Sequence, residues 1–130
     1  MKKAALALLF CGALARAQPR TEPPSPASGK DMFRAYCAPC HGRDAKGNGP
    51  AASAFRTPPS DLTALAQKHG GRFPGAEVAK ELSSVYQAPH GSIDMPVWGP
   101  IFTEISPKSD AVGALRVTNI VRYIETLQAK

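Results

Sequence analysis

The chain of 130 residues contains only three cysteines, and aromatic residues make up 7% of it. It has almost no runs in which apolar and polar residues alternate, the pattern that predicts half-buried β-strands. Runs of Lys and Arg interleaved with aromatic residues are also missing, which argues against binding to nucleic acid. No glycine-rich stretch ends in Gly-Lys-Ser or Gly-Lys-Thr, so a phosphate-binding loop is not supported. These absences favour a helical fold and give no support for a protein that binds nucleic acid or has a phosphate-binding loop.

Residues 1–17 have the features of a secretory signal peptide. Two lysines precede a short apolar run over residues 4–14, and residues 15–17 (Ala-Arg-Ala) form a cleavage site of the small-x-small type. The apolar run is too short to span a bilayer, so a retained membrane helix is the weaker interpretation. Lipoprotein processing at Cys11 is disfavoured because the bulky Phe10 precedes it. We therefore expect the mature protein to be periplasmic or otherwise exported.

Removing this segment changes both the charge and the cysteine count. The full chain has 16 basic and 10 acidic residues, and the signal segment carries three of the basic ones, so the mature chain has a net charge of +3. Its only cysteines are Cys37 and Cys40, which leaves no spare pair for a structural disulfide. Residues 18–27 are rich in proline and poor in apolar residues, which predicts a disordered tether. Residues 28–130 then form one small domain.

The stretch Cys37-Ala38-Pro39-Cys40-His41 carries the main functional signal. Two cysteines separated by two residues and followed by histidine form the pattern that attaches c-type haem. On a helix the two sulfur atoms lie about one turn apart, which lets them reach neighbouring vinyl groups of one porphyrin. His41 follows directly and can ligate the iron. The sequence therefore predicts one haem c, covalently bound through Cys37 and Cys40.

Two other interpretations of this motif are weaker. A structural zinc site would need a second ligand pair, and only His69 and His90 remain, far apart in the sequence. His69 is better explained as a solvent-exposed residue at the end of a helix. A thiol-disulfide enzyme is the stronger rival, because Cys-x-Pro-Cys at a helix start also presents a cysteine of low pKa. Such enzymes need β-strands, for which this sequence gives little signal.

Helices are predicted around the motif over residues 28–41, 60–70 and 76–84 and from Asp110 onwards. Ser28 and Asp31 indicate the start of the first helix, and Ser60 and Asp110 can cap the second and the last. Two consecutive glycines at 70–71 stop the second helix. The last helix carries a broad apolar stripe, formed by Val112, Leu115, Val117, Ile120, Val121, Ile124 and Leu127.

With these residues in place, the chain resembles the class I c-type cytochromes, in particular small bacterial monohaem cytochromes c similar to domains associated with terminal oxidases. Gly29 and Phe33 stand eight and four residues before Cys37, as in the first helix of that family. Residues 49–52 (Gly-Pro-Ala-Ala) and 95–99 (Met-Pro-Val-Trp-Gly) are similar to its loops. The resemblance implies an all-α fold, in which three to five helices surround one covalently attached haem.

The resemblance also implies roles for single residues. Met95 would be the second axial ligand of the iron, and the backbone carbonyl of Pro50 would bind the other imidazole nitrogen of His41. Tyr123 would be the aromatic residue by which the last helix meets the first. His90 remains an alternative to Met95, because the two lie within six residues on one loop.

The predicted function is that of an electron carrier, which transfers single electrons between redox partners in a respiratory-type chain. An iron with two axial ligands has no open position for a substrate, so we expect no enzymatic activity. The alternatives are a cytochrome c subunit of a larger oxidoreductase complex and, less favoured, a thiol-disulfide oxidoreductase. We expect a monomer that binds redox proteins, including a membrane oxidoreductase. Four basic residues could form a rim around the haem edge that steers an acidic partner: Arg34, Arg43, Lys46 and Arg56.

Overall fold

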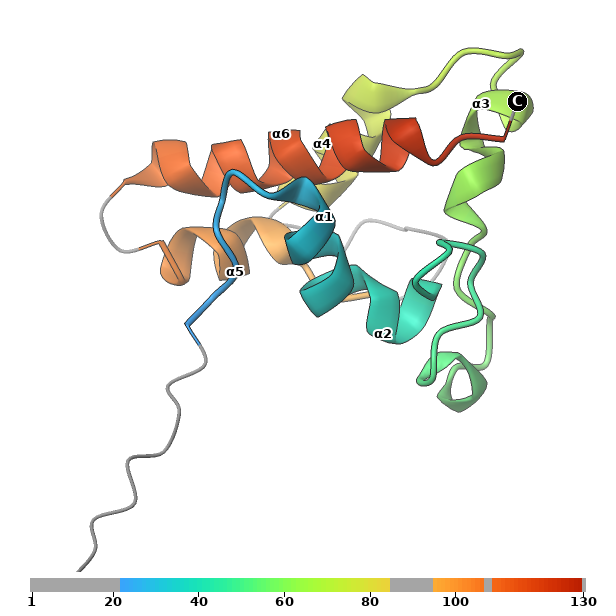
Figure 1. The fold of residues 1–130 in the computed structure, drawn as a ribbon, viewed down its shortest axis with the longest axis horizontal. Helices are drawn as coiled ribbons and strands as arrows, with labels where there is room; N and C mark the ends of the chain where they lie inside the picture. The colour runs from blue at the N-terminus through green and yellow to red at the C-terminus, as the bar shows by residue number, and fades with distance from the viewer. Residues whose placement is uncertain (1–21, 85–94, 107–108, 130) are drawn as a thin grey trace, which may run out of the picture.

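The computed structural model describes residues 22–84, 95–106 and 109–129. All regular secondary structure in these ranges is helical, and α1, α4 and α5 pack against the long helix α6 (Figure 1). The elements are α1 (Gly29–Met32), the π-helical η1 (Phe33–Cys37), α2 (Ala38–His41), the 3₁₀ turns η2 (Ala52–Ala54) and η3 (Leu62–Ala64), α3 (Leu65–Lys68), α4 (Gly75–Ser83), α5 (Trp98–Glu104) and α6 (Asp110–Thr126). No helix within these ranges is long and apolar enough to cross a bilayer. The prediction of an all-α fold is confirmed.

The first helix consists of α1, η1 and α2, which follow one another without a break. Ser28 caps it as predicted: its Oγ accepts a hydrogen bond from the N–H of Asp31 (3.2 Å) and donates one to the Asp31 carboxylate (2.6 Å). The middle turn is π-helical, because the N–H of Ala38 bonds to the carbonyl of Phe33, five residues earlier. With this stretch counted as one helix, the described part of the chain has five, within the predicted number.

The first helix crosses α6 at Gly29. A Cβ atom on Gly29 would overlap the backbone carbonyl oxygen of Asn119, so only glycine permits this close approach. Four residues further on, the rings of Phe33 and Tyr123 lie 5.4 Å apart, within the range of favourable aromatic pairs. The contact between the first and last helices that the resemblance implied is confirmed.

The apolar stripe of α6 forms one wall of the core. Its most deeply buried members are Val117, Ile120 and Ile124. Leu115 does not belong to the stripe, since 43% of its surface is exposed. The cap is Ser109 rather than Asp110, because the Ser109 hydroxyl accepts a hydrogen bond from the N–H of Ala111 (3.1 Å). The apolar spacing thus predicted the helix correctly, but its N-cap lies one residue earlier than predicted.

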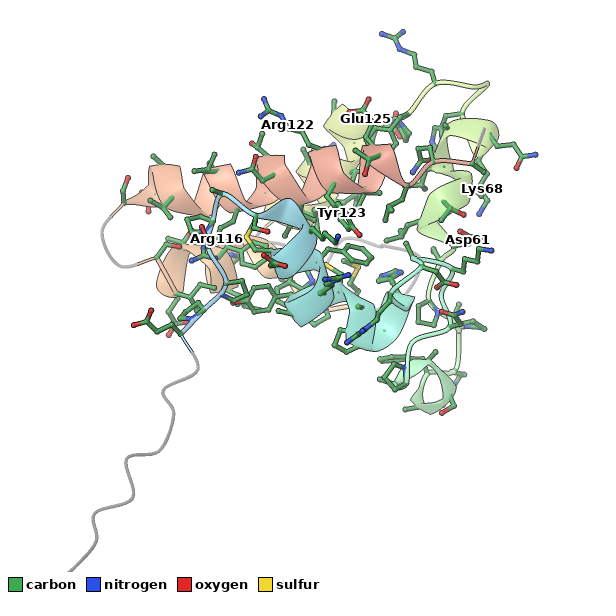
Figure 2. The ribbon with its side chains drawn as sticks, in the orientation of Figure 1. Asp61, Lys68, Arg116, Arg122, Tyr123 and Glu125 are labelled. Carbon is green, nitrogen blue, oxygen red and sulfur yellow. The ribbon has the colours of Figure 1, made fainter. Side chains whose placement is uncertain are left out.

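The segment before α1 is held on α6. The guanidinium of Arg116 (labelled in Figure 2) donates a hydrogen bond to the carbonyl of Pro24 (2.8 Å). The amide of Asn119 donates one to the carbonyl of Pro26 (2.8 Å). The prediction of a disordered tether over residues 18–27 is therefore wrong at its C-terminal end. Proline lacks an N–H but keeps a good acceptor oxygen, and α6 supplies the two donors.

The helix predicted over residues 60–70 is present in a shorter form, as η3 followed by α3. Its N-cap is Asp61 instead of Ser60, because the Asp61 carboxylate accepts hydrogen bonds from the N–H and the hydroxyl of Thr63 (2.8 and 2.6 Å). Gly70 and Gly71 follow with φ values of +67° and +88°, and they end the helix as predicted.

His69 lies at the C-terminal end of α3, with 40% of its side chain exposed. Its Nδ1 is 2.8 Å from the carbonyl oxygen of Leu65, and its Nε2 is 3.4 Å from the carboxylate of Glu77 in α4. The interpretation of His69 as an exposed residue at a helix end is confirmed. The α4 helix spans Gly75–Ser83, one residue earlier than predicted.

Candidate haem-attachment site

The three side chains of the cysteine–histidine motif lie at the C-terminal end of the first helix. Cys37 is the last residue of the π-helical turn and is buried, with 6% of its surface exposed. Cys40 is half-buried, and His41 is 8% exposed. Gly42 then ends the helix with φ +80°, a conformation that glycine adopts without strain. The structure therefore places both thiols and the imidazole on one helix end, as predicted.

The imidazole of His41 is oriented by a backbone carbonyl. Its Nδ1 lies 2.9 Å from the carbonyl oxygen of Ser60. Because a carbonyl can only accept, Nδ1 carries the proton of the neutral ring, and Nε2 carries the lone pair. This is the tautomer that can ligate a metal through Nε2, and the hydrogen bond makes the ring a stronger donor. The donor set thus fits haem c, which needs two thiols and one imidazole.

Pro50 does not have the role that the resemblance implied, and that prediction is corrected. Pro50 is exposed, and the loop around it folds back on α2: the N–H of Gly49 bonds to the carbonyl of Cys40 (3.0 Å), and that of Ala51 bonds to the carbonyl of Pro39 (2.9 Å). These bonds satisfy carbonyls at the helix end, which have no partner inside the helix. No local sequence pattern marks Ser60 as this partner, because the group that binds His41 is a backbone carbonyl.

The turn that carries Ser60 is fixed by contacts with the loop after His41. The N–H of Leu62 donates to the carbonyl of Ala45 (2.8 Å). Gly47, with φ +80°, lies so close to the carbonyl of Pro59 that a Cβ atom would overlap it. These two contacts lie on either side of Ser60 and direct its carbonyl toward the imidazole.

Burial has a strong effect on the Cys37 thiol. Desolvation, with a smaller contribution from the charge of Cys40, raises the pKa of Cys37 to about 12. A thiol-disulfide enzyme needs the opposite, a cysteine whose pKa is lowered so that the thiolate is present at neutral pH. Together with the helical fold, the raised pKa of Cys37 argues against the thiol-disulfide alternative.

Met95 lies just before α5, and its partly buried side chain packs against the core cluster that contains Phe33 and Phe102. Trp98 begins α5, and its ring lies 5.5 Å from that of Tyr36 and 5.3 Å from that of Phe102. This aromatic cluster joins α5 to the first helix and holds the backbone three residues after Met95 in place. Ligation by Met95 stays a prediction, and the alternative ligand, His90, lies outside the described residues.

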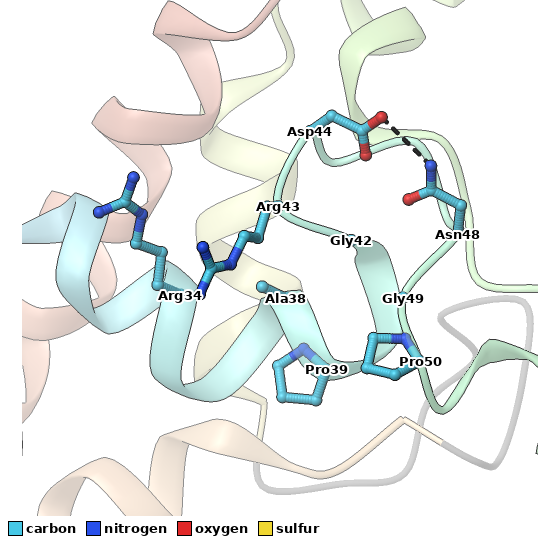
Figure 3. Close-up of a pocket in the computed structure, with 9 residues that line it drawn as sticks. All are labelled: Arg34, Ala38, Pro39, Gly42, Arg43, Asp44, Asn48, Gly49 and Pro50. Carbon is cyan, nitrogen blue, oxygen red and sulfur yellow. Dashed lines mark hydrogen bonds between the residues drawn. The ribbon is translucent and has the colours of Figure 1, made fainter.

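A surface depression of about 510 Å³ lies over α2 and the loop that follows it (Figure 3). Arg34 and Arg43, two of the four residues of the predicted basic rim, both line it. Among the described residues, no carboxylate lies within ion-pair distance of either guanidinium. Asp44 also lines the depression, and its carboxylate accepts a hydrogen bond from Asn48 (3.2 Å). The other two members of the rim are not part of the lining.

The chain was compared with known proteins and families. The family described as cytochrome c oxidase, cbb3-type, subunit III matches residues 24–110. No curated protein and no solved structure matches significantly. The matched range contains the whole cysteine–histidine motif and Met95, and it begins at Pro24, where the chain is held on α6. Since the match covers more than half of the chain, the protein belongs to the cbb3-type subunit III family of class I c-type cytochromes, and its cofactor is a covalently bound haem c.

Proposed function

We propose that this protein is an exported monohaem cytochrome c that transfers single electrons between redox partners. One observation carries the proposal. His41, which directly follows the second cysteine of the motif, has its Nδ1 hydrogen-bonded to the Ser60 carbonyl, and this is the tautomer that ligates through Nε2. The family supports a haem c domain that carries electrons. The leader-like segment 1–17 supports export.

In this proposal Cys37 and Cys40 form the two thioether bonds, and His41 and Met95 are the axial ligands. Haem c supplies a one-electron Fe(III)/Fe(II) couple, and the protein sets its potential through the ligands, burial and hydrogen bonds. The thioether of methionine favours the reduced iron relative to a second imidazole. With both axial positions taken by side chains, no position remains for a substrate, which supports a carrier rather than an enzyme.

Replacing each candidate ligand by alanine tests which residue is the second axial ligand of the iron. The oxidised wild-type protein should show a far-red absorption from sulfur-to-iron charge transfer, and Met95→Ala should abolish this band and open the reduced iron to carbon monoxide. His90→Ala is the matched control and should leave both properties unchanged. If His90→Ala opens the iron instead, the roles of the two residues must be exchanged.

A second candidate is supported by the family description, which names a subunit of a terminal oxidase. The protein would then work as a bound subunit of an oxidoreductase complex instead of a diffusing carrier. Mild crosslinking in the native membrane fraction, followed by purification, distinguishes the two. A stoichiometric complex with oxidase subunits supports the bound subunit, and recovery in the periplasmic fraction alone supports the carrier. The mass of the recovered protein reports whether residues 1–17 were removed.

A further inference from the structure

The C-terminal end of the chain reaches the turn that orients His41. The side-chain amide of Gln128 makes three hydrogen bonds: its Nε2 donates to the carbonyls of Leu62 (2.8 Å) and Ile124 (2.9 Å), and its Oε1 accepts from the N–H of Ala66 (2.8 Å). Both amide protons and the carbonyl oxygen are therefore used. Among the described residues, no other side chain makes three hydrogen bonds that connect the end of α6 with η3 and α3.

Two of these bonds replace a missing backbone bond. In a continuous α-helix the N–H of Ala66 would donate to the carbonyl of Leu62, four residues earlier. Here η3 changes to α3 between these residues, and the amide of Gln128 bonds to both groups. A fourth bond, from the N–H of Ala129 to the carbonyl of Thr63 (2.9 Å), ties the same junction to the end of the chain.

The junction is directly connected to the iron ligand. Leu62 begins η3, and Ser60, two residues earlier, offers its carbonyl to Nδ1 of His41 at 2.9 Å. Backbone bonds that hold η3 therefore limit the directions in which the Ser60 carbonyl can point. We propose that Gln128 is a positioning residue for His41, which it orients through η3 and the Ser60 carbonyl. The inference rests on the proposed function, since it assumes that His41 ligates the iron.

The test compares holoprotein variants at position 128. Gln128→Met keeps the size and removes all three bonds, and Gln128→Glu places a carboxylate against two carbonyls. Loss of these partly buried hydrogen bonds at the junction should increase local opening, so the Nδ1 proton of His41 should exchange with solvent about tenfold faster or more. A weaker bond at Nδ1 makes the imidazole a poorer donor, which disfavours Fe(III), so the midpoint potential should rise. Gln67→Glu, at an exposed position of α3, is the charge-matched control and should change neither value.

The outcomes separate the two proposals. If the wild-type reduced protein lacks ring-current-shifted His41 resonances, His41 is not the axial ligand and the proposed function fails. If those resonances are present but Nδ1 exchange and potential stay at wild-type values in both variants while the melting temperature falls, Gln128 has only a structural role and this inference is overturned. If the variants do not fold, hydrogen exchange in the wild type tests the role of Gln128 instead. The N–H of Ala66 and the Nδ1–H of His41 should then exchange through one opening reaction, with the same free energy of opening. Clearly different free energies would contradict the inference.

Discussion

Asp61 directly follows Ser60 and caps η3 with its carboxylate. Its carboxylate accepts two hydrogen bonds from Thr63, chiefly the one from the hydroxyl, and these lower the pKa of Asp61 below its ordinary value of 3.8. A carboxyl group whose pKa is lowered in the folded state stabilises that state above its unfolded pKa. The stabilisation is lost as the pH falls through the folded pKa.

The direction of this pKa shift predicts that the difference in free energy of unfolding between the wild type and Asp61→Asn depends on pH in the acid range. Asparagine can still cap η3 but carries no charge, so the wild type should have the higher free energy of unfolding at neutral pH. The difference should stay constant down to about pH 5 and shrink below it. Urea titrations of both holoproteins at a series of pH values measure it. A difference that already shrinks between pH 7 and pH 5 would point to another group.

Single residues also show what the sequence could not predict about the site. The motif identified Cys37, Cys40 and His41 because their side chains carry the chemistry. The partner of His41 is a backbone carbonyl, which every residue possesses, so the sequence did not distinguish Ser60 from Pro50. Gln128 was missed for a similar reason, since glutamine near a chain end is common and its bonds depend on a helix break far away in the sequence.

At the scale of elements, Arg116 connects three parts of the fold. It lies in α6 and is 5% exposed. Its Nε donates to the hydroxyl of Ser106 after α5 (2.9 Å), and its Nη1 lies 2.8 Å from the carbonyl of Pro24 and 3.6 Å from the sulfur of Met32 in α1. One guanidinium thus joins the N-terminal segment, the first helix and the end of α5 to α6.

Replacing Arg116 by Met should release the N-terminal segment. Loss of the two oxygen bonds leaves a buried hydroxyl without its donor, and we expect a destabilisation of about 1–3 kcal/mol. Proteases should also cleave near residues 22–27 faster than in the wild type. Arg122→Met, on the outer side of the same helix (Figure 2), is the matched control and should stay within about 0.5 kcal/mol. Equal effects of both substitutions would contradict the role given to Arg116.

Most helices were predictable in type and position, but α5 (Trp98–Glu104) was not predicted, because residues 95–99 were interpreted as a loop. The junctions between elements were not predictable. The helical period located the first and last helices, and Gly29 and Phe33 indicated where they meet. The π-helical turn before Cys37 and the break between η3 and α3 have no local sequence pattern. Both depend on contacts made after the elements pack, as does the docking of residues 24–27 on α6.

At the scale of the whole molecule, the net charge of +3 expected after removal of residues 1–17 is small, so the positions of single charges should matter more than their sum. Arg34 and Arg43 lie on one depression without an ion pair among the described residues. Their guanidinium groups can attract anions over a distance of about 10 Å at moderate ionic strength. We therefore predict that this surface favours partners that present carboxylates.

Oxidation of the reduced protein by small reagents tests this surface. The double substitution Arg34→Gln and Arg43→Gln should slow the reaction with the anionic oxidant ferricyanide, and should weaken its dependence on ionic strength up to about 0.1 M. Lys80→Gln with Arg122→Gln removes the same charge from exposed positions on α4 and α6 and should have the smaller effect. Equal effects of the two pairs would show that only total charge matters.

The position of α6 at the end of the chain sets an order of events in time. Its contacts with Pro24 and Pro26 join residues 92 and 93 positions apart, so they form only when nearly the whole chain is present. In the unfolded chain burial does not act on the Cys37 thiol, whose ordinary pKa is 9.0. Once the core closes, burial raises that pKa to about 12 and the reactive thiolate becomes scarce. We therefore expect the thioether bond at Cys37 to form most readily before the core has closed around this thiol.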